Sequence, residues 1–226
     1  MSDLGNQIKA AIDTAPPGRV WVPADFAALG SRDAIDKALQ RMVAAGALRR
    51  IDRGLYDRPV INRLTKRLTV PDYREILDAL SRRDGIRMLV DGMTAANDLG
   101  LSDAVPARVT IHTDSRRRTI HLEKLVIAFK LTAPSRLYWA GRPAMRVVQA
   151  LHWLKDTLPR GADVIRSRLA VILADSEIAD DVRQGFSVLP AWMQDFVRTV
   201  PGFDALPPQA PKRPRAKPRM AVGQAQ

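Results

Sequence analysis

Apolar side chains in the first thirty residues change from helical to extended spacing and back. Over residues 4–14 they recur every three or four positions and predict a helix, which the Pro-Pro-Gly run at 16–18 ends. The Val-Trp-Val run at 20–22 predicts a short strand. Pro23 suits the first position of a short helix over 24–29, because its missing N–H costs nothing there. The predicted order is therefore helix, strand, helix.

A longer amphipathic helix and a tight hairpin follow. The hydroxyl of Ser31 can cap a helix that runs to about residue 45 and has one apolar and one polar face. Two short strands at 48–51 and 55–56 then surround Gly54, which allows the positive φ that a tight hairpin requires. Helix, strand, helix, turn, helix and hairpin in this order predict a winged helix-turn-helix, with the hairpin as its wing.

The polar face of the longer helix and the basic hairpin are the candidate DNA-binding surface. The major groove admits one α-helix, and helix-turn-helix proteins read bases with the N-terminal half of that helix. Wing arginines are better suited to phosphates, which fix register without reading sequence. The expected contact residues are Ser31, Arg32, Asp33, Asp36, Lys37, Gln40 and Arg41 from the helix, with Arg49, Arg50, Arg53 and Tyr56 supporting backbone contacts from the wing.

The rest of the chain predicts a second, mixed part after a connector at 59–71. Three segments with extended spacing predict a small antiparallel sheet, at 109–113, 119–122 and 125–131. A further short strand is expected within 86–92. Helical spacing predicts helices over 73–83, 93–99, 145–158, 163–174, 176–184 and 190–200.

These elements indicate an α+β fold with two domains. The winged helix-turn-helix is expected at 1–60 and the mixed α/β domain, with its small antiparallel sheet and C-terminal helices, at 70–205. Residues 206–226 are rich in proline and basic residues and predict a disordered tail. This tail could anchor nonspecifically on phosphates, or it could serve only solubility.

Charge and composition favour a nucleic acid as partner. The 226 residues carry a formal net charge of +12, and basic residues cluster around the predicted wing. Cysteine is absent, which excludes disulfides and thiolate metal sites. Neither a signal peptide nor an apolar run long enough for a membrane helix is found, so we expect a cytoplasmic protein with no membrane partner.

The sequence contains no catalytic motif that we recognise, and we expect neither catalysis nor a cofactor. Phosphate-binding glycine loops and nucleophile-elbow patterns are missing. The three histidines, His112, His121 and His152, could place two imidazoles near carboxylates on one sheet, but they lack metal-ligand spacing. We therefore expect no metal site.

Two sets of residues resemble AbiEi-like antitoxins of type IV toxin–antitoxin systems. The N-terminal set is the more specific, above all the Arg-Gly-Leu-Tyr sequence at 53–56. A looser set includes the Gly-Met-Thr-Ala-Ala-Asn-Asp-Leu-Gly-Leu sequence at 92–101, Pro106 and the Gln-Ala-Leu sequence at 149–151. The N-terminal residues are Gly18, Val20, Trp21, Pro23, Asp25, Phe26, 29–32, Gly46, 48–51 and 53–56.

The resemblance covers roughly residues 5–200 and implies a two-part function. In that family the N-terminal domain binds double-stranded operator DNA and represses its own operon, while the C-terminal domain has the antitoxin activity. The partner is a nucleotidyltransferase-like toxin, which is countered without a stable complex. The residues alone leave two alternatives open: a winged-helix regulator whose second domain senses a ligand or dimerises, and a protein–protein adaptor that does not bind DNA.

Overall fold

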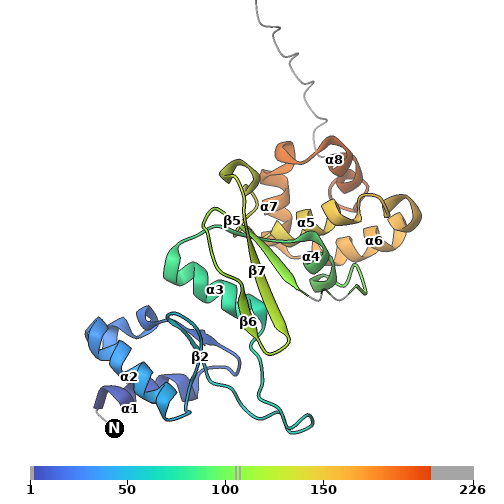
Figure 1. Ribbon diagram of the computed structural model, residues 1–226. Helices are drawn as coiled ribbons and strands as arrows, with labels where there is room; N and C mark the ends of the chain where they lie inside the picture. Colours follow the sequence, from blue (N-terminus) through green and yellow to red (C-terminus); the bar gives the residue numbers. More distant parts are fainter. Residues whose placement is uncertain (1–2, 105, 107, 205–226) are drawn as a thin grey trace, which may run out of the picture.

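The computed structural model describes residues 3–104, 106 and 108–204, so the predicted tail at 206–226 lies outside the described residues. Its N-terminal part contains helix α1 (Asp3–Thr14), strand β1 (Val20–Trp21), the 3₁₀ helix η1 (Pro23–Leu29) and helix α2 (Arg32–Ala44). Strands β2 (Arg49–Asp52) and β3 (Leu55–Asp57) complete it. This element order is that of a winged helix-turn-helix (Figure 1), as the hydrophobic pattern predicts.

The three short strands form one antiparallel sheet in the order β1-β3-β2. Gly54, at the hairpin turn, has φ of 68°, which is the left-handed conformation expected there. Phe26 from η1 stacks on Trp21 from β1 with ring centroids 5.2 Å apart, and both lie in a core with buried residues of α1 and α2. Helices α1 and α2 thus pack on each other and leave the outer side of α2 uncovered.

The short helix before α2 is a 3₁₀ helix, and Asp25 fixes its start. The Asp25 carboxylate accepts a hydrogen bond from the backbone N–H of Val22 at 2.9 Å, and Pro23 occupies the first turn as expected. Asp25 and Phe26 of the Pro-x-Asp-Phe sequence therefore have different structural roles, because Asp25 caps the helix and Phe26 fills the core.

The connector contains an ordered turn of its own. Ile61 and Leu68 form an isolated antiparallel bridge, and the side-chain oxygen of Asn62 accepts hydrogen bonds from the backbone N–H groups of Leu64 and Thr65. Such a turn is typical of asparagine, whose side chain can hydrogen-bond the backbone two residues further on. The connector is therefore a small loop that projects from the molecule (Figure 1).

The second part packs helices on both sides of a four-stranded sheet. Helix α3 (Tyr73–Asp84) lies on one side, next to the winged helix, and the later helices gather on the other side (Figure 1). The strands are β4 (Met88–Val90), β5 (Val109–Thr113), β6 (Ile120–Leu122) and β7 (Leu125–Leu131). The remaining helices are α4 (Gly92–Asp98), η2 (Pro134–Arg136), α5 (Met145–Leu154), α6 (Leu158–Ile172), α7 (Ser176–Gln184), η3 (Phe186–Val188) and α8 (Ala191–Arg198).

The α+β fold class is confirmed, with two corrections of detail. The four-stranded sheet has the order β4-β5-β7-β6, and its central pair β5 and β7 runs parallel, so the sheet is mixed where we expected antiparallel pairing throughout. The intervening strand β6 returns the chain to the far edge, so that β7 can insert beside β5. The helix predicted over 145–158 also ends earlier, at Leu154, and α6 begins at Leu158, before the predicted start at 163.

The two parts share a packed junction at α3. Val20, Val22 and Leu55 of the winged helix belong to the same buried cluster as Ile76 and Leu80 of α3. This face of the small sheet is covered by the second part, while the opposite face packs against α1 and α2. The winged helix is therefore held by α3 rather than attached only through the connector.

Candidate nucleic-acid interface

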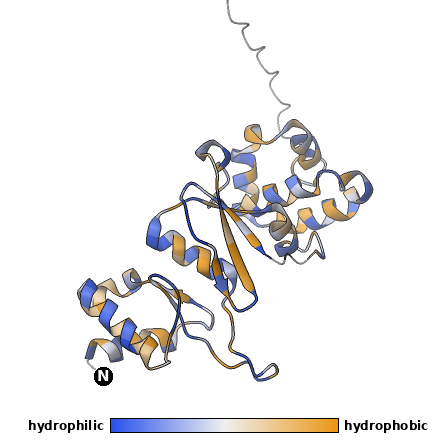
Figure 2. Cartoon of the chain, viewed as in Figure 1, coloured by the Kyte–Doolittle hydropathy of each residue, from blue (hydrophilic) through white to orange (hydrophobic). Residues whose placement is uncertain are grey.

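Helix α2 presents a polar face to solvent because its sequence places apolar residues on one side only. The hydroxyl of Ser31 accepts a hydrogen bond from the backbone N–H of Ala34 at 3.4 Å, which caps the helix as predicted. Ile35, Leu39 and Met42 are buried against the rest of the winged helix. Figure 2 shows hydrophilic residues along the outer side of α2. The position of α2 in the fold is that of a recognition helix.

Of the predicted contact residues on α2, all but Asp36 are exposed, as contact with DNA requires. Asp36 is partly buried. Arg32 Nε lies 2.9 Å from Asp36 Oδ2, an i, i+4 ion pair on the surface that leaves 66% of the Arg32 side chain exposed. Arg41 Nε donates to the backbone oxygen of Lys37 at 3.3 Å, which orients Arg41 along the helix. The exposed members are Ser31, Arg32, Asp33, Lys37, Gln40 and Arg41.

This arrangement offers donors for base edges in the major groove. Arginine can pair with guanine and glutamine with adenine, each through two hydrogen bonds. Asp36 already accepts from Arg32, so in the free protein these two side chains partly neutralise each other. Lys37, Gln40 and Arg41 are left as the donors with no carboxylate partner among the described residues.

The wing differs from expectation at Arg49. Its guanidinium pairs with the buried carboxylate of Asp57 through two hydrogen bonds of 3.0 and 2.6 Å, and it also donates to the backbone oxygen of Thr69 at 2.8 Å. Only 18% of the Arg49 side chain is exposed. We therefore correct its predicted role, because a guanidinium that neutralises a buried carboxylate is not free to bind a phosphate.

Tyr56 is also removed from the predicted contact set. Its side chain is 4% exposed and belongs to the core around Trp21 and Phe26, so it supports the wing from inside. Arg50 and Arg53 remain exposed at the hairpin and can contact phosphates. The wing thus contributes two of the four residues expected from it.

No sequence pattern identified the residues that hold the wing in place. Arg82, near the end of α3, donates to the backbone oxygen of Val20 at 2.8 Å and pairs with Asp25 at 3.2 Å. Its neighbour Arg83 donates to the backbone oxygen of Arg53 at the tip of the wing. No local signal distinguishes these arginines from solvated ones at the end of a helix, since the groups of the winged helix that they bind lie far away in sequence.

A second ion-pair cluster joins α3 to the arginine-rich turn after β5. Asp84 pairs with Arg83 at 2.7 Å and with Arg117 at 2.6 Å. Burial alone would raise the pKa of Asp84, but the adjacent Arg83 and Arg117 guanidinium groups outweigh it and lower that pKa. Arg117 therefore ties the end of α3 to this turn, while Arg116 and Arg118 stay exposed beside it.

The connector extends the basic surface beyond the predicted contact set. Arg63, Lys66 and Arg67 are exposed on the projecting turn, and they form no ion pair with the residues that the structure describes. In the sequence they belong to the cluster of basic residues that extends from the wing into the connector. They are additional candidates for phosphate contacts.

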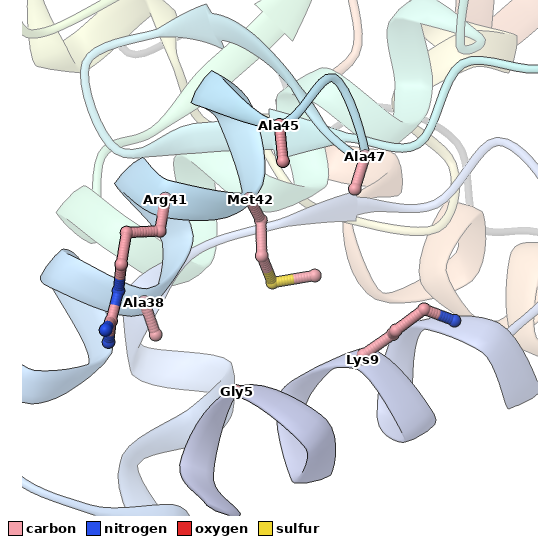
Figure 3. Close-up of a pocket in the computed structure, with 7 residues that line it drawn as sticks. All are labelled: Gly5, Lys9, Ala38, Arg41, Met42, Ala45 and Ala47. Carbon is pink, nitrogen blue, oxygen red and sulfur yellow. The ribbon is translucent and has the colours of Figure 1, made fainter. Parts of the chain in front are cut away.

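A small apolar groove lies between α1 and α2, behind the contact face. Its cavity measures about 280 Å³. Figure 3 shows the side chain of Met42 reaching from α2 toward α1, with Gly5 opposite and Lys9 and Arg41 at the rim. Small residues such as Ala38 and Ala45 leave this space open. Apart from Lys9 and Arg41 at the rim, the residues that line the groove are apolar or small.

The structure brings no metal-ligating cluster together within the residues it describes. In residues 3–104, 106 and 108–204 there is no group of three or more His, Asp or Glu side chains that could hold a metal ion. His112 instead bonds through Nδ1 to the hydroxyl of Thr132, 3.0 Å away. Over the same residues, every helix is too short or too polar to traverse a lipid bilayer.

The chain belongs to a family of unknown function, DUF6088, whose model matches residues 7–179. None of the curated proteins compared with the chain matches it. The matched region runs from α1 into α7 and so includes the winged helix, the junction at α3 and the four-stranded sheet. The family is therefore defined by both parts together rather than by the winged helix alone.

Proposed function

We propose that this protein binds double-stranded operator DNA through the exposed face of α2 and represses its own operon. The observation that supports this most strongly is the combination on α2 of a capped N-terminus with an uncovered polar face that includes Lys37, Gln40 and Arg41. The net charge of +12 adds a long-range attraction to a polyanion.

The position of each basic residue in the winged helix determines whether we assign it to bases or to phosphates. Arg32, Lys37 and the other exposed residues in the first turns of α2 read bases, since this half of a recognition helix enters the groove. Arg50 and Arg53 of the wing hold phosphates and set the register. The exposed cations of the connector add salt-dependent affinity without preference for sequence.

The second part is proposed to have the antitoxin activity of a type IV toxin–antitoxin system. The support for this role is the resemblance of the sequence to AbiEi-like antitoxins. Two residues of that resemblance, Asp25 and Phe26, build the winged helix and its junction to α3. The functional partner would be a nucleotidyltransferase-like toxin, opposed without a stable complex.

The DNA-binding proposal is tested by a mobility shift with the full chain. The DNA upstream of its own gene is compared with a scrambled duplex of equal length, across a salt series. We expect tighter binding to the upstream DNA that survives competitor DNA. Equal and steeply salt-dependent binding to both duplexes would reduce the interface to a basic surface and overturn operator reading.

The antitoxin proposal needs a separate test. An adjacent gene that encodes a nucleotidyltransferase-like protein should arrest growth when it is expressed alone. Co-expression of the present chain with that gene should restore growth. A wild-type chain that represses the operon but gives no rescue would favour the alternative, a regulator without antitoxin activity. If the chain binds neither DNA nor heparin, the adaptor alternative is favoured instead.

A further inference from the structure

A cavity of the second part lies where the two parallel strands end. Its volume is about 770 Å³, within the range of about 300–1,000 Å³ typical of small-molecule sites. The strands β5 and β7 run in the same direction, so their carboxyl ends meet at one edge of the sheet. Ligands of open sheets with parallel strands bind at such edges.

The strand register places two polar side chains side by side at this edge. His112 of β5 and Lys130 of β7 are direct partners across the parallel pair, and both line the cavity. Arg136 of η2 adds a second cation, and His152 of α5 faces the cavity from the helical side. The two cations form no ion pair with any residue that the structure describes, and no carboxylate lines the cavity.

A hydrogen-bond chain determines which nitrogen of His112 carries the proton. The hydroxyl of Thr132 donates to the backbone oxygen of Lys130 at 3.1 Å, so it accepts from Nδ1 of His112, 3.0 Å away. In the neutral ring the proton then lies on Nδ1, and Nε2 is left as a hydrogen-bond acceptor. Burial, followed by the charge of Lys130, lowers the pKa of His112, while Asp91 at the start of α4 opposes this shift.

The rest of the lining suits an organic group. Tyr138 and Trp139 line the cavity together with Leu131 and Val188. Tyr138 is half-exposed and stands edge-on to Trp139, with ring centroids 5.1 Å apart. The lining therefore combines basic groups with aromatic and aliphatic groups.

We propose that this cavity binds a phosphorylated small molecule of nucleotide size, with its phosphates on Lys130 and Arg136, its organic group against Tyr138 and a hydroxyl of that group on Nε2 of His112. The two cations supply donors that phosphate oxygens accept, and the unprotonated Nε2 of neutral His112 is an acceptor that suits a ligand hydroxyl. A ligand of this class would give the second part a means to sense the metabolic state of the cell, independently of whether the protein is an antitoxin.

The test measures binding of ADP, inorganic phosphate and adenosine to the full chain by isothermal titration calorimetry. ADP should bind more tightly than inorganic phosphate, and adenosine should bind least. Because α2 and the connector are also basic, a matched pair of variants locates the site. Lys130→Gln with Arg136→Gln should weaken ADP binding by about tenfold for each cation removed. Lys124→Gln with Arg160→Gln, which removes two exposed cations elsewhere, should leave it unchanged.

The three histidines give a second, independent measurement. Proton NMR of the imidazole C–H signals should show ADP shifting His112 and His152, while His121, exposed on β6 outside the cavity, stays unchanged. Each signal is assigned with a His→Gln variant. ADP binding that both variant pairs weaken equally, ADP that shifts no cavity histidine, or adenosine that binds as well as ADP would each overturn the proposal.

Discussion

Helix α2 and the wing both carry arginines, yet the structure uses these residues in opposite ways. On α2, Arg32 and Arg41 stay exposed and bond only within their own helix. In the wing, Arg49 pairs with the buried Asp57 and reaches the connector at Thr69. One surface is left open to a partner, while much of the other holds the protein together.

The difference shows that charge density alone does not define an interface. A buried carboxylate is strongly destabilising unless an opposite charge neutralises it, so Asp57 requires Arg49 whatever else the wing does. Exposed cations are solvated by water and do not need a carboxylate partner, so their ion pairs contribute little to stability. An arginine near a DNA-binding helix must therefore be sorted by its partner before it is assigned to phosphate.

The largest effect expected from this comparison is on stability. Replacing Arg49 with alanine leaves Asp57 buried and unpaired, and should lower the free energy of unfolding by about 3 kcal/mol. Arg41→Ala on the exposed face should change it by less than about 0.5 kcal/mol. Urea unfolding followed by tryptophan fluorescence measures both. Equal stability of the two variants would show that the wing ion pair is dispensable.

Next in size is the effect of Lys37 on sequence preference. Lys37→Ala should cost about 1–3 kcal/mol of binding to the operator and much less to scrambled DNA, because a base contact is lost. The control variant Arg160→Ala, which removes an exposed cation on α6, should bind as the wild type does. Competition mobility shifts provide the measurement. If Lys37→Ala weakens both duplexes equally, α2 does not read bases.

A smaller effect should separate the open part of the wing from α2. Arg50→Gln and Arg53→Gln should each weaken binding to all duplexes alike and reduce the slope of log affinity against log salt by about 1. Their unfolding free energies should stay at the wild-type value within about 0.5 kcal/mol. A change in preference among sequences would assign the wing to base reading and reverse the proposed roles.

The smallest effect is a loss of stability in acid at the ion pairs between the end of α3 and the arginine-rich turn. The pKa of Asp84 is lowered in the fold, so its stabilising contribution is fully present above the ordinary value of 3.8 and is lost as pH falls through the folded-state pKa. The Asp84→Asn variant lacks this titration. Its unfolding free energy should therefore fall less steeply with acid than that of the wild type, and identical slopes would contradict the assignment.

Much of the winged helix could be predicted because its signals are local. Ser31 as the cap, Gly54 at the turn and the apolar stripe of α2 each depend on neighbours within a few residues. The Arg49–Asp57 pair was not predicted, although the two residues are direct partners across the hairpin. The burial of this pair has no local sequence signal, because it depends on how the connector packs back against the wing at Thr69.

The second part was predicted as a list of elements but not as an arrangement. The spacing of Val109 to Thr113 and of the segment at 125–131 identified two strands, whereas their parallel pairing depends on the route of the chain through β6. For the same reason His112 and Lys130 were not recognised as neighbours. Arg136 and His152 join them only because η2 and α5 fold over the same edge.

The sequence by itself determined the element order, the polar face of α2 and the excess of positive charge, since these follow from spacing and composition. Only the tertiary structure decided which cations are committed to carboxylates, which surface stays open, and that a basic cavity forms beside the sheet. The physical reason is that burial and pairing depend on contacts between residues distant in sequence, and these contacts form only when the chain packs.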